Sequence, residues 1–214
     1  MGKKFFKRLL QAAGILLVLL SCALLVGPLL RLLRRHSPDP LTQLLELADE
    51  KAWLNDWIEA APLYQKVEEL CAQRKDQSCA LYARVSQIPA HSETASISTQ
   101  IAQLSKDLTL PAARDYRTRL RVLSVRGMLE VNYDAAMTSA TYSAIETMAL
   151  QRGHFLVAAR ARGEQGIADF LTGNIAAAKK KVVRPSRQIR DHDEWNSRLH
   201  IRWSVVNTIN NSRG

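Results

Sequence analysis

The chain has 214 residues, of which 47% are hydrophobic and 6% aromatic, so it is long enough to bury the core of a compact domain. Its formal net charge of +10 would suggest a nucleic-acid-binding protein if the basic side chains lay within the folded part. They concentrate at the ends instead, because residues 1–35 hold seven basic and no acidic residues and residues 36–183 hold 17 of each, which argues against nucleic acid as a partner.

The first predicted element is a membrane-spanning helix at residues 9–30, a run of 22 residues without a charged side chain. At about 1.5 Å per residue such a helix crosses a hydrocarbon core of about 30 Å. A basic flank, residues 1–8, precedes it, and a basic, proline-containing linker, residues 31–40, follows it. A cleaved signal peptide is the alternative, but the run is longer than a typical signal-peptide core, and no small-residue cleavage site follows Gly27-Pro28. We therefore expect a single-pass membrane protein that contacts the lipid bilayer through residues 9–30.

The charges beside this run bear on the compartment of the remaining chain. Four basic side chains and the amino terminus precede the run, and three arginines follow it. Since the more basic side tends to stay in the cytoplasm, we expect the following domain to be extracytoplasmic, although the near balance leaves the membrane orientation open. In an oxidising compartment Cys71 and Cys79 would form a disulfide. Two half-buried thiols are the alternative, and the sequence does not decide between them.

After the linker the sequence predicts only helices. Leucine and alanine recur at three- and four-residue steps from Leu41 onward, which is typical of amphipathic helices. The predicted helices are residues 41–54, 56–70, 78–87, 93–108, 111–129, a sixth ending near 152, 154–171, and an eighth starting at 175. Ser92 is a candidate N-cap of the fourth helix. Residues 184–214 lose the helical spacing and are predicted to be a poorly ordered polar tail.

The predicted helices contain a repeated pattern. Similar segments, "WIEAAPLYQKV", "YDAAMTSATYS" and "NIAAAKKKV", begin the second helices of several pairs. Aligning Ala60, Ala136 and Ala178 leaves intervals of 76 and 42 residues, which predicts a period of about 38–42 residues. A unit between the first two would place Ser98 at the small-residue position.

These segments resemble the tetratricopeptide-repeat family in its longer, divergent form. The matching residues are Gly166, Gly173, Ile175, Ala178 and Val182 in the last unit and Trp57, Ala60, Tyr64 and Val67 in the first. The resemblance covers residues 41–183 and implies an all-α fold, a right-handed α-solenoid of about four helix pairs, with Ala136 as a further packing residue. A membrane anchor before such repeats is similar to the organisation of bacterial, including acidobacterial, signalling proteins. An unrelated all-α bundle is the alternative fold.

No catalytic constellation is found in the sequence. It has no phosphate-binding glycine loop, no nucleophile elbow and no His-Glu zinc helix. The acidic segment at residues 191–194, with His200 nearby, lies in the polar tail, where a solvated surface is the simpler interpretation. We therefore expect no enzymatic activity, no cofactor and no metal.

Three arginines are candidate binding residues. The family resemblance places Arg121 and Arg160 on first-helix positions that face the groove, and Arg117 lies one turn before Arg121. The planar guanidinium group suits recognition of a peptide carboxylate or an acidic side chain. Ordinary surface solubility is the competing explanation for all three.

Three functions are compatible with these observations. The first is a membrane-anchored repeat scaffold that binds a protein or peptide and has no catalytic activity. The second is the truncated sensory or regulatory part of a larger signalling protein, such as a sensor kinase, without its output domain. The third is an unrelated enzyme built on an all-α bundle.

Overall fold

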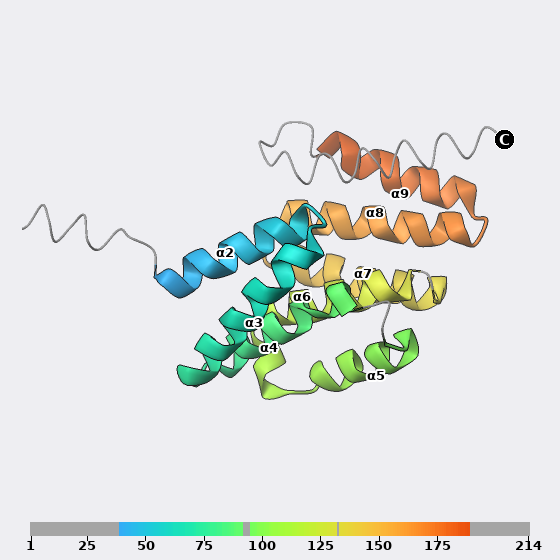
Figure 1. Ribbon diagram of the computed structural model, residues 1–214. Coiled ribbons are helices and arrows are strands. Elements are labelled where there is room, and N and C mark those ends of the chain that lie inside the picture. The colour runs from blue at the N-terminus through green and yellow to red at the C-terminus, as the bar shows by residue number, and fades with distance from the viewer. Residues whose placement is uncertain (1–38, 92–94, 132, 189–214) are drawn as a thin grey trace, which may run out of the picture. The chain divides into compact units, whose positions relative to one another are not determined.

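The structure, a computed structural model, describes residues 39–91, 95–131 and 133–188 (Figure 1). Within these ranges it contains eight α-helices, two short 3-10 helices and no strand, which confirms the all-α prediction. The elements are α2 (Pro40–Trp53), α3 (Trp57–Gln73), α4 (Gln77–Ser86), η1 (Ile88–His91), α5 (Ile97–Asp107), η2 (Pro111–Arg114), α6 (Tyr116–Glu130), α7 (Ala135–Leu150), α8 (Phe155–Leu171) and α9 (Ile175–Gln188).

The chain divides into two units between Gln43 and Leu44, and the packing described below is that of the described residues of the second unit. No helix within the described ranges is long and apolar enough to cross a membrane. The predicted anchor at residues 9–30 lies outside those ranges, as do its basic flank, most of the linker, and the fourth helix's candidate cap Ser92. The predicted polar tail is corrected at its start, because α9 continues to Gln188.

Short polar side chains determine where several helices begin. The carboxylates of Asp56, Asp76, Asp115 and Asp134 accept hydrogen bonds from backbone N–H groups in the first turns of α3, α4, α6 and α7, at 2.8–3.3 Å. The amide oxygen of Asn174 accepts from the N–H of Ala177 in the first turn of α9, at 3.3 Å. Each such cap contributes about 1 kcal/mol. Asp115 also explains why the predicted helix over 111–129 is interrupted, because its extended backbone separates η2 from α6.

Residues with positive φ close four of the turns between helices. Asn55, Lys75, Gly153 and Gly173 have φ values of 59°, 58°, 72° and 79°. In each turn the residue after the positive-φ residue donates its N–H to the carbonyl five residues before it. This bond pairs a carbonyl in the last turn of the preceding helix that would otherwise lack a partner within the helix. Gly173 was predicted to be a packing residue. A Cβ atom there would meet nothing within 4 Å, so its role is to permit the turn.

Apolar side chains are buried between helices that follow one another along the chain. One cluster joins α4, α5 and α6 around Val85, Leu104 and Val122. A second joins α6, α7 and α8 around Leu123 and Ile145. Figure 1 shows α8 and α9 running side by side, and α8 also packs against α7, which packs against α6.

Two glycines allow large side chains to approach neighbouring helices. A Cβ atom on Gly127 of α6 would lie 2.8 Å from the ring of Tyr142 on α7. A Cβ atom on Gly166 of α8 would lie 2.6 Å from the Cγ2 atom of Val182 on α9. Both distances are well below the 3.5–4.0 Å of an ordinary carbon–carbon contact. At these two positions the helices therefore lie closer together than a residue with a side chain would allow.

Four helices share both their spacing and their burial pattern. The first residues of α3, α5, α7 and α9 are separated by 40, 38 and 40 residues. In each helix the residue seven positions after the first one is large and buried: Tyr64, Leu104, Tyr142 and Val182.

The same comparison corrects the predicted repeat alignment. The buried small residue of α3 is Ala60, three positions after the helix begins, and the equivalent residues are Thr138 in α7 and Ala178 in α9, all 0% exposed. Ala136, which the sequence alignment selected, is exposed in the first turn of α7 because the cap at Asp134 sets the helix start. Ser98 of α5 is likewise exposed.

Candidate functional site

Two of the predicted arginines meet at one carboxylate. Arg117 and Arg121 are one turn apart on α6 and therefore lie on the same helix face. The Nη2 atom of Arg117 donates to Asp49 Oδ2 at 2.9 Å. The Nη2 atom of Arg121 donates to Asp49 Oδ1, and Asp49 belongs to the last turns of α2. The arginines are thus paired with an acidic residue of the same chain.

Two tyrosines complete the coordination of this carboxylate. The hydroxyl of Tyr64 on α3 donates to Asp49 Oδ1 at 2.6 Å. The hydroxyl of Tyr82 on α4 lies 2.8 Å from Oδ1 and 2.9 Å from Oδ2 of Asp49. Arg121 also donates to Tyr64 Oη at 3.0 Å and to Tyr82 Oη at 2.7 Å. We call Asp49, Tyr64, Tyr82, Arg117 and Arg121 the Asp49 network.

The arginines of the Asp49 network also stack on its aromatic rings. The Cζ atom of Arg121 lies 4.8 Å from the ring centre of Tyr82 and 5.7 Å from that of Tyr64. The Cζ atom of Arg117 lies 4.9 Å from the ring centre of Tyr82. These cation–π contacts add to the hydrogen bonds. The Arg121 side chain is only 19% exposed. The ring contacts and hydrogen bonds together explain how its charged group is accommodated below the surface.

The surroundings of the network raise the pKa of both tyrosines and of Arg121. Burial raises the pKa of Tyr64 and of Tyr82, and Asp49 raises both further, although Arg121 opposes this effect. Burial by itself lowers the pKa of Arg121, but Tyr82, Tyr64 and Asp49 outweigh it and raise the pKa above the ordinary value. At neutral pH the tyrosine hydroxyls therefore donate and Arg121 is charged.

The network reaches the surface on the side of Arg117. The Arg117 side chain is 54% exposed and that of Asp49 is 26% exposed. By contrast, Tyr64 is fully buried. A solvent-borne group can thus approach the carboxylate and the outer guanidinium without any opening of the core.

The third predicted arginine makes a separate contact with the same helix, α2. The Cζ atom of Arg160 on α8 lies 4.6 Å from the ring centre of Trp53. Trp53 is one turn after Asp49, so the two residues occupy one face of α2. Neither Asp49 nor Trp53 was identified as a site residue from the sequence, and Tyr64 was identified only as a packing residue. The four-residue spacing of the acidic and aromatic side chains was the available signal.

A second aromatic and basic cluster lies beside Arg117. Tyr116 begins α6, and its hydroxyl is 2.8 Å from Nδ1 of His154, which precedes α8. The two rings meet edge to face with centroids 5.0 Å apart. The Cζ atom of Arg152 lies 4.3 Å from the ring centre of Tyr116. Arg117 follows Tyr116 in the sequence and is exposed, although its guanidinium group bonds Asp49. We call Tyr116, Arg117, Arg152 and His154 the basic face.

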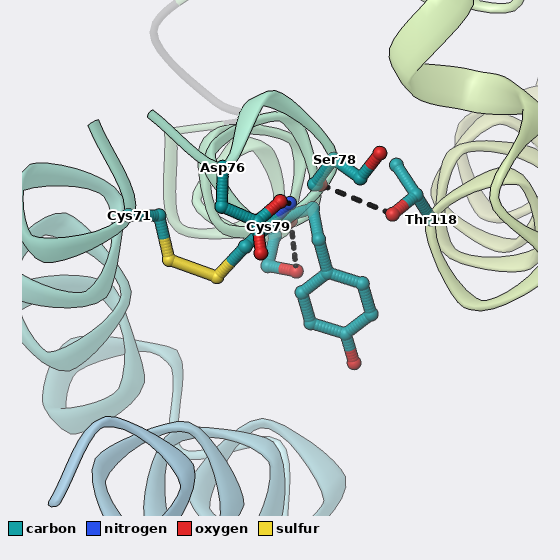
Figure 2. The surroundings of a disulfide bond; sticks show 7 residues. Cys71, Asp76, Ser78, Cys79 and Thr118 are labelled. Carbon is teal, nitrogen blue, oxygen red and sulfur yellow. Dashed lines mark hydrogen bonds between the residues drawn. A yellow bond between two sulfur atoms is a disulfide. The ribbon is translucent and has the colours of Figure 1, made fainter. Parts of the chain in front are cut away.

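A disulfide joins α3 to α4, which resolves the pairing that the sequence leaves open. Figure 2 shows the bond between Cys71 and Cys79, with Cα atoms 5.7 Å apart. The carboxylate of Asp76 caps the same turn by accepting from the N–H of Cys79 at 3.0 Å. On the other side of α4, the Thr118 hydroxyl donates to the carbonyl of Ser78 at 3.0 Å (Figure 2). These bonds connect the start of α4 to α3 and α6.

Neither sequence nor structural comparison identifies a relative. No family model, no curated protein and no solved structure matches this chain. Among the described residues no group of three or more potential ligands could hold a metal ion, and the acidic segment at 191–194 lies outside them.

Proposed function

We propose that this protein is a membrane-anchored scaffold of tetratricopeptide-like helix pairs that binds a protein or peptide partner and has no catalytic activity of its own. In this proposal residues 9–30 hold the chain in the membrane. Helices α2–α9 form four pairs that stack as a right-handed solenoid and present side chains to an acidic partner.

The repeat assignment is supported by spacing and by packing. The second helices of the pairs begin 40, 38 and 40 residues apart. Gly127 and Gly166 each admit a large side chain from the second helix of the same pair. A helix pair cannot bury its apolar faces alone, so such pairs stack on their neighbours.

The observation that carries the binding proposal is the exposed basic face. Its members, Tyr116, Arg117, Arg152 and His154, come from the start of α6 and from the turn before α8. Arginine and tyrosine are over-represented among the residues that dominate the free energy of protein association. A guanidinium group that stacks on an aromatic ring is already oriented, so it loses less entropy when it binds a carboxylate.

An extracytoplasmic position of the helical domain belongs to the same proposal. Disulfides persist in oxidising compartments and are rare in the cytosol, and the Cys71–Cys79 bond therefore favours this orientation. A membrane-impermeant thiol reagent, applied after reduction of intact cells, should label Cys79, which is partly exposed, whereas Cys71 is fully buried. Absence of labelling in intact cells, with labelling after lysis, would place the domain in the cytoplasm.

The binding proposal is tested by comparing two charge-matched variants. The full chain is purified in detergent from crosslinked membranes as wild type, as R117A/R152A, and as K66A/K179A. The control lysines are exposed on α3 and α9, helices that contribute no residue to the basic face. A partner retained by the wild type and by the control, but lost by R117A/R152A with an unchanged circular dichroism spectrum, supports the proposal. Equal retention by all three proteins refutes it.

A further inference from the structure

Helix α2 contacts the rest of the domain in the way a bound ligand would. It supplies one acidic and one aromatic side chain, Asp49 and Trp53, spaced by one helical turn. Every donor to the Asp49 carboxylate comes from another helix: Tyr64 from α3, Tyr82 from α4, and Arg117 and Arg121 from α6.

We propose that the surface formed by Tyr82, Arg117, Arg121 and Arg160 is a recognition site for an amphipathic helix bearing an acidic and an aromatic residue four positions apart, and that α2 occupies this site in the free protein. The partner helix would displace α2 and present the same pair of side chains. This inference rests on the proposed binding function, and it assigns the chemistry of the partner and a means of regulation.

The acidic position is built as a carboxylate site. Two guanidinium groups and two hydroxyls surround one carboxylate, with ordinary hydrogen-bond distances of 2.6–2.9 Å from Tyr64, Tyr82 and Arg117. Charge-assisted bonds of this kind are stronger than neutral ones and specific for planar anions. Without a carboxylate, Arg121 would be an unpaired charge below the surface, which is unfavourable. The site therefore requires an acidic occupant from α2 or from a partner.

The aromatic position provides the second anchor. Arg160 stacks on Trp53 with 4.6 Å between Cζ and the ring centre. The face of α2 beside these anchors carries Leu45, Ala48 and Ala52, which are at most 7% exposed. Small residues at the latter two positions let a helix approach its neighbours closely. A helix that fits this site therefore carries one acidic and one aromatic residue four positions apart, beside a buried face of apolar residues that includes small ones.

The position of α2 also permits exchange with a partner. Its opposite face, including Glu46, Leu47 and Glu50, is exposed, and only residues 54–56 connect it to α3. The Asp49 carboxylate and Arg117 are both accessible from solvent. A competing helix would bind the fraction of molecules in which α2 has left, so its apparent affinity is lowered by that fraction. The helix α2 thereby acts as an autoinhibitory segment.

The test uses the sequence of α2 itself as the probe. A fluorescein-labelled peptide of residues 40–53 is titrated against the full chain in detergent micelles, followed by fluorescence anisotropy. The D49N/W53A protein, whose own α2 lacks both anchors, should bind this peptide at least about tenfold more tightly than the wild type, which corresponds to a population shift of about 1.4 kcal/mol. The matched E46Q/E50Q variant, altered on the exposed face of α2, should bind like the wild type. A peptide carrying the D49N and W53A changes should bind the D49N/W53A protein at least about tenfold more weakly than the unchanged peptide.

A second measurement does not depend on any variant. Hydrogen exchange of the wild-type chain, with the peptide in large excess, should accelerate in α2 and not in α9. Equal affinity of the wild type and D49N/W53A, equal binding of the two peptides, or unchanged exchange in α2 would each overturn the inference. Complete competition by acetate would also overturn it, because an isolated carboxylate would then suffice. Since the probe is not the natural partner, these outcomes are independent of the partner-retention experiment above.

Discussion

Replacement of Gly166 by alanine tests the close packing of α8 against α9. The added methyl group would lie 2.6 Å from Val182 Cγ2, 3.2 Å from the carbonyl oxygen of Ala178, and 3.3 Å from Lys181 Cβ. The valine cannot rotate away freely, because a β-branched side chain in a helix has one strongly preferred rotamer. The carbonyl oxygen is backbone and moves only if α9 moves. The two helices must therefore separate to admit the methyl group.

Two opposing effects determine the size of the change in stability. Overpacking of a close contact costs about 1–3 kcal/mol, whereas alanine is about 1 kcal/mol more favourable than glycine within a helix. We expect Gly166→Ala to lower the free energy of unfolding by about 1 kcal/mol, within a range of about 0–2 kcal/mol set by these two opposing effects. If Val182 is alanine already, the nearest contact is absent, and the helix preference should make the same substitution neutral or stabilising.

The free energies of unfolding of the wild type, G166A, V182A and G166A/V182A form a double-mutant cycle. They are measured by urea unfolding, followed by circular dichroism. Hydrogen exchange in α8 and α9 reports whether the loss is local, as the proposed repeat architecture predicts. The G173A variant is the control, since it should cost about 1–2 kcal/mol through its positive φ whether or not Val182 is present. An equal effect of G166A in both backgrounds, or stabilisation by G166A alone, would refute the packing argument.

Two further predictions concern the tyrosines and the disulfide. Burial raises the pKa of Tyr64 and Tyr82 above 10.0, so above that pH the unfolded chain releases protons that the folded protein keeps. Their contribution to stability is complete below about pH 10 and declines by about 1.4 kcal/mol per pH unit for each tyrosine above it; replacing both by phenylalanine should flatten this decline in urea midpoints. The bond between Cys71 and Cys79, eight residues apart, should contribute about 2.5 kcal/mol by restricting the unfolded chain. Reduction should therefore lower the urea midpoint of the wild type and leave that of a C71A/C79A variant unchanged.

Much of the fold could be predicted from local signals in the sequence. Helices begin directly after short polar residues such as Asp56 and Asp134, and they end just before residues that tolerate positive φ, such as Gly173. These signals act within a few residues, so they are readable without tertiary structure. The alignment of repeats was less accurate, because paired alanines occur in α7 on its exposed first turn. The cap at Asp134, and not the alanine pair, sets the register that buries Thr138.

The candidate site was only partly predictable, for a different physical reason. Arg117 and Arg121 were identified as one face of a helix, and that relation depends on spacing alone. Their acceptor, Asp49, lies 68 and 72 residues away in the sequence, and no local pattern indicates such a contact. Trp53 fell near the end of the predicted helix over residues 41–54, and nothing local indicated that Arg160 stacks on its ring.

The difference between a binding arginine and a structural one depends on where its counter-charge comes from. A guanidinium group below the surface needs an anion, and the chain can supply it or leave it to a partner. In the Asp49 network the chain supplies it through a helix that carries the acceptor but none of the donors. The same groups that stabilise the free protein would then recognise a partner with matching side chains. Under this model, substitutions within α2, such as D49N/W53A, lower stability and raise partner affinity together, whereas for a purely structural network they would lower stability without raising partner affinity.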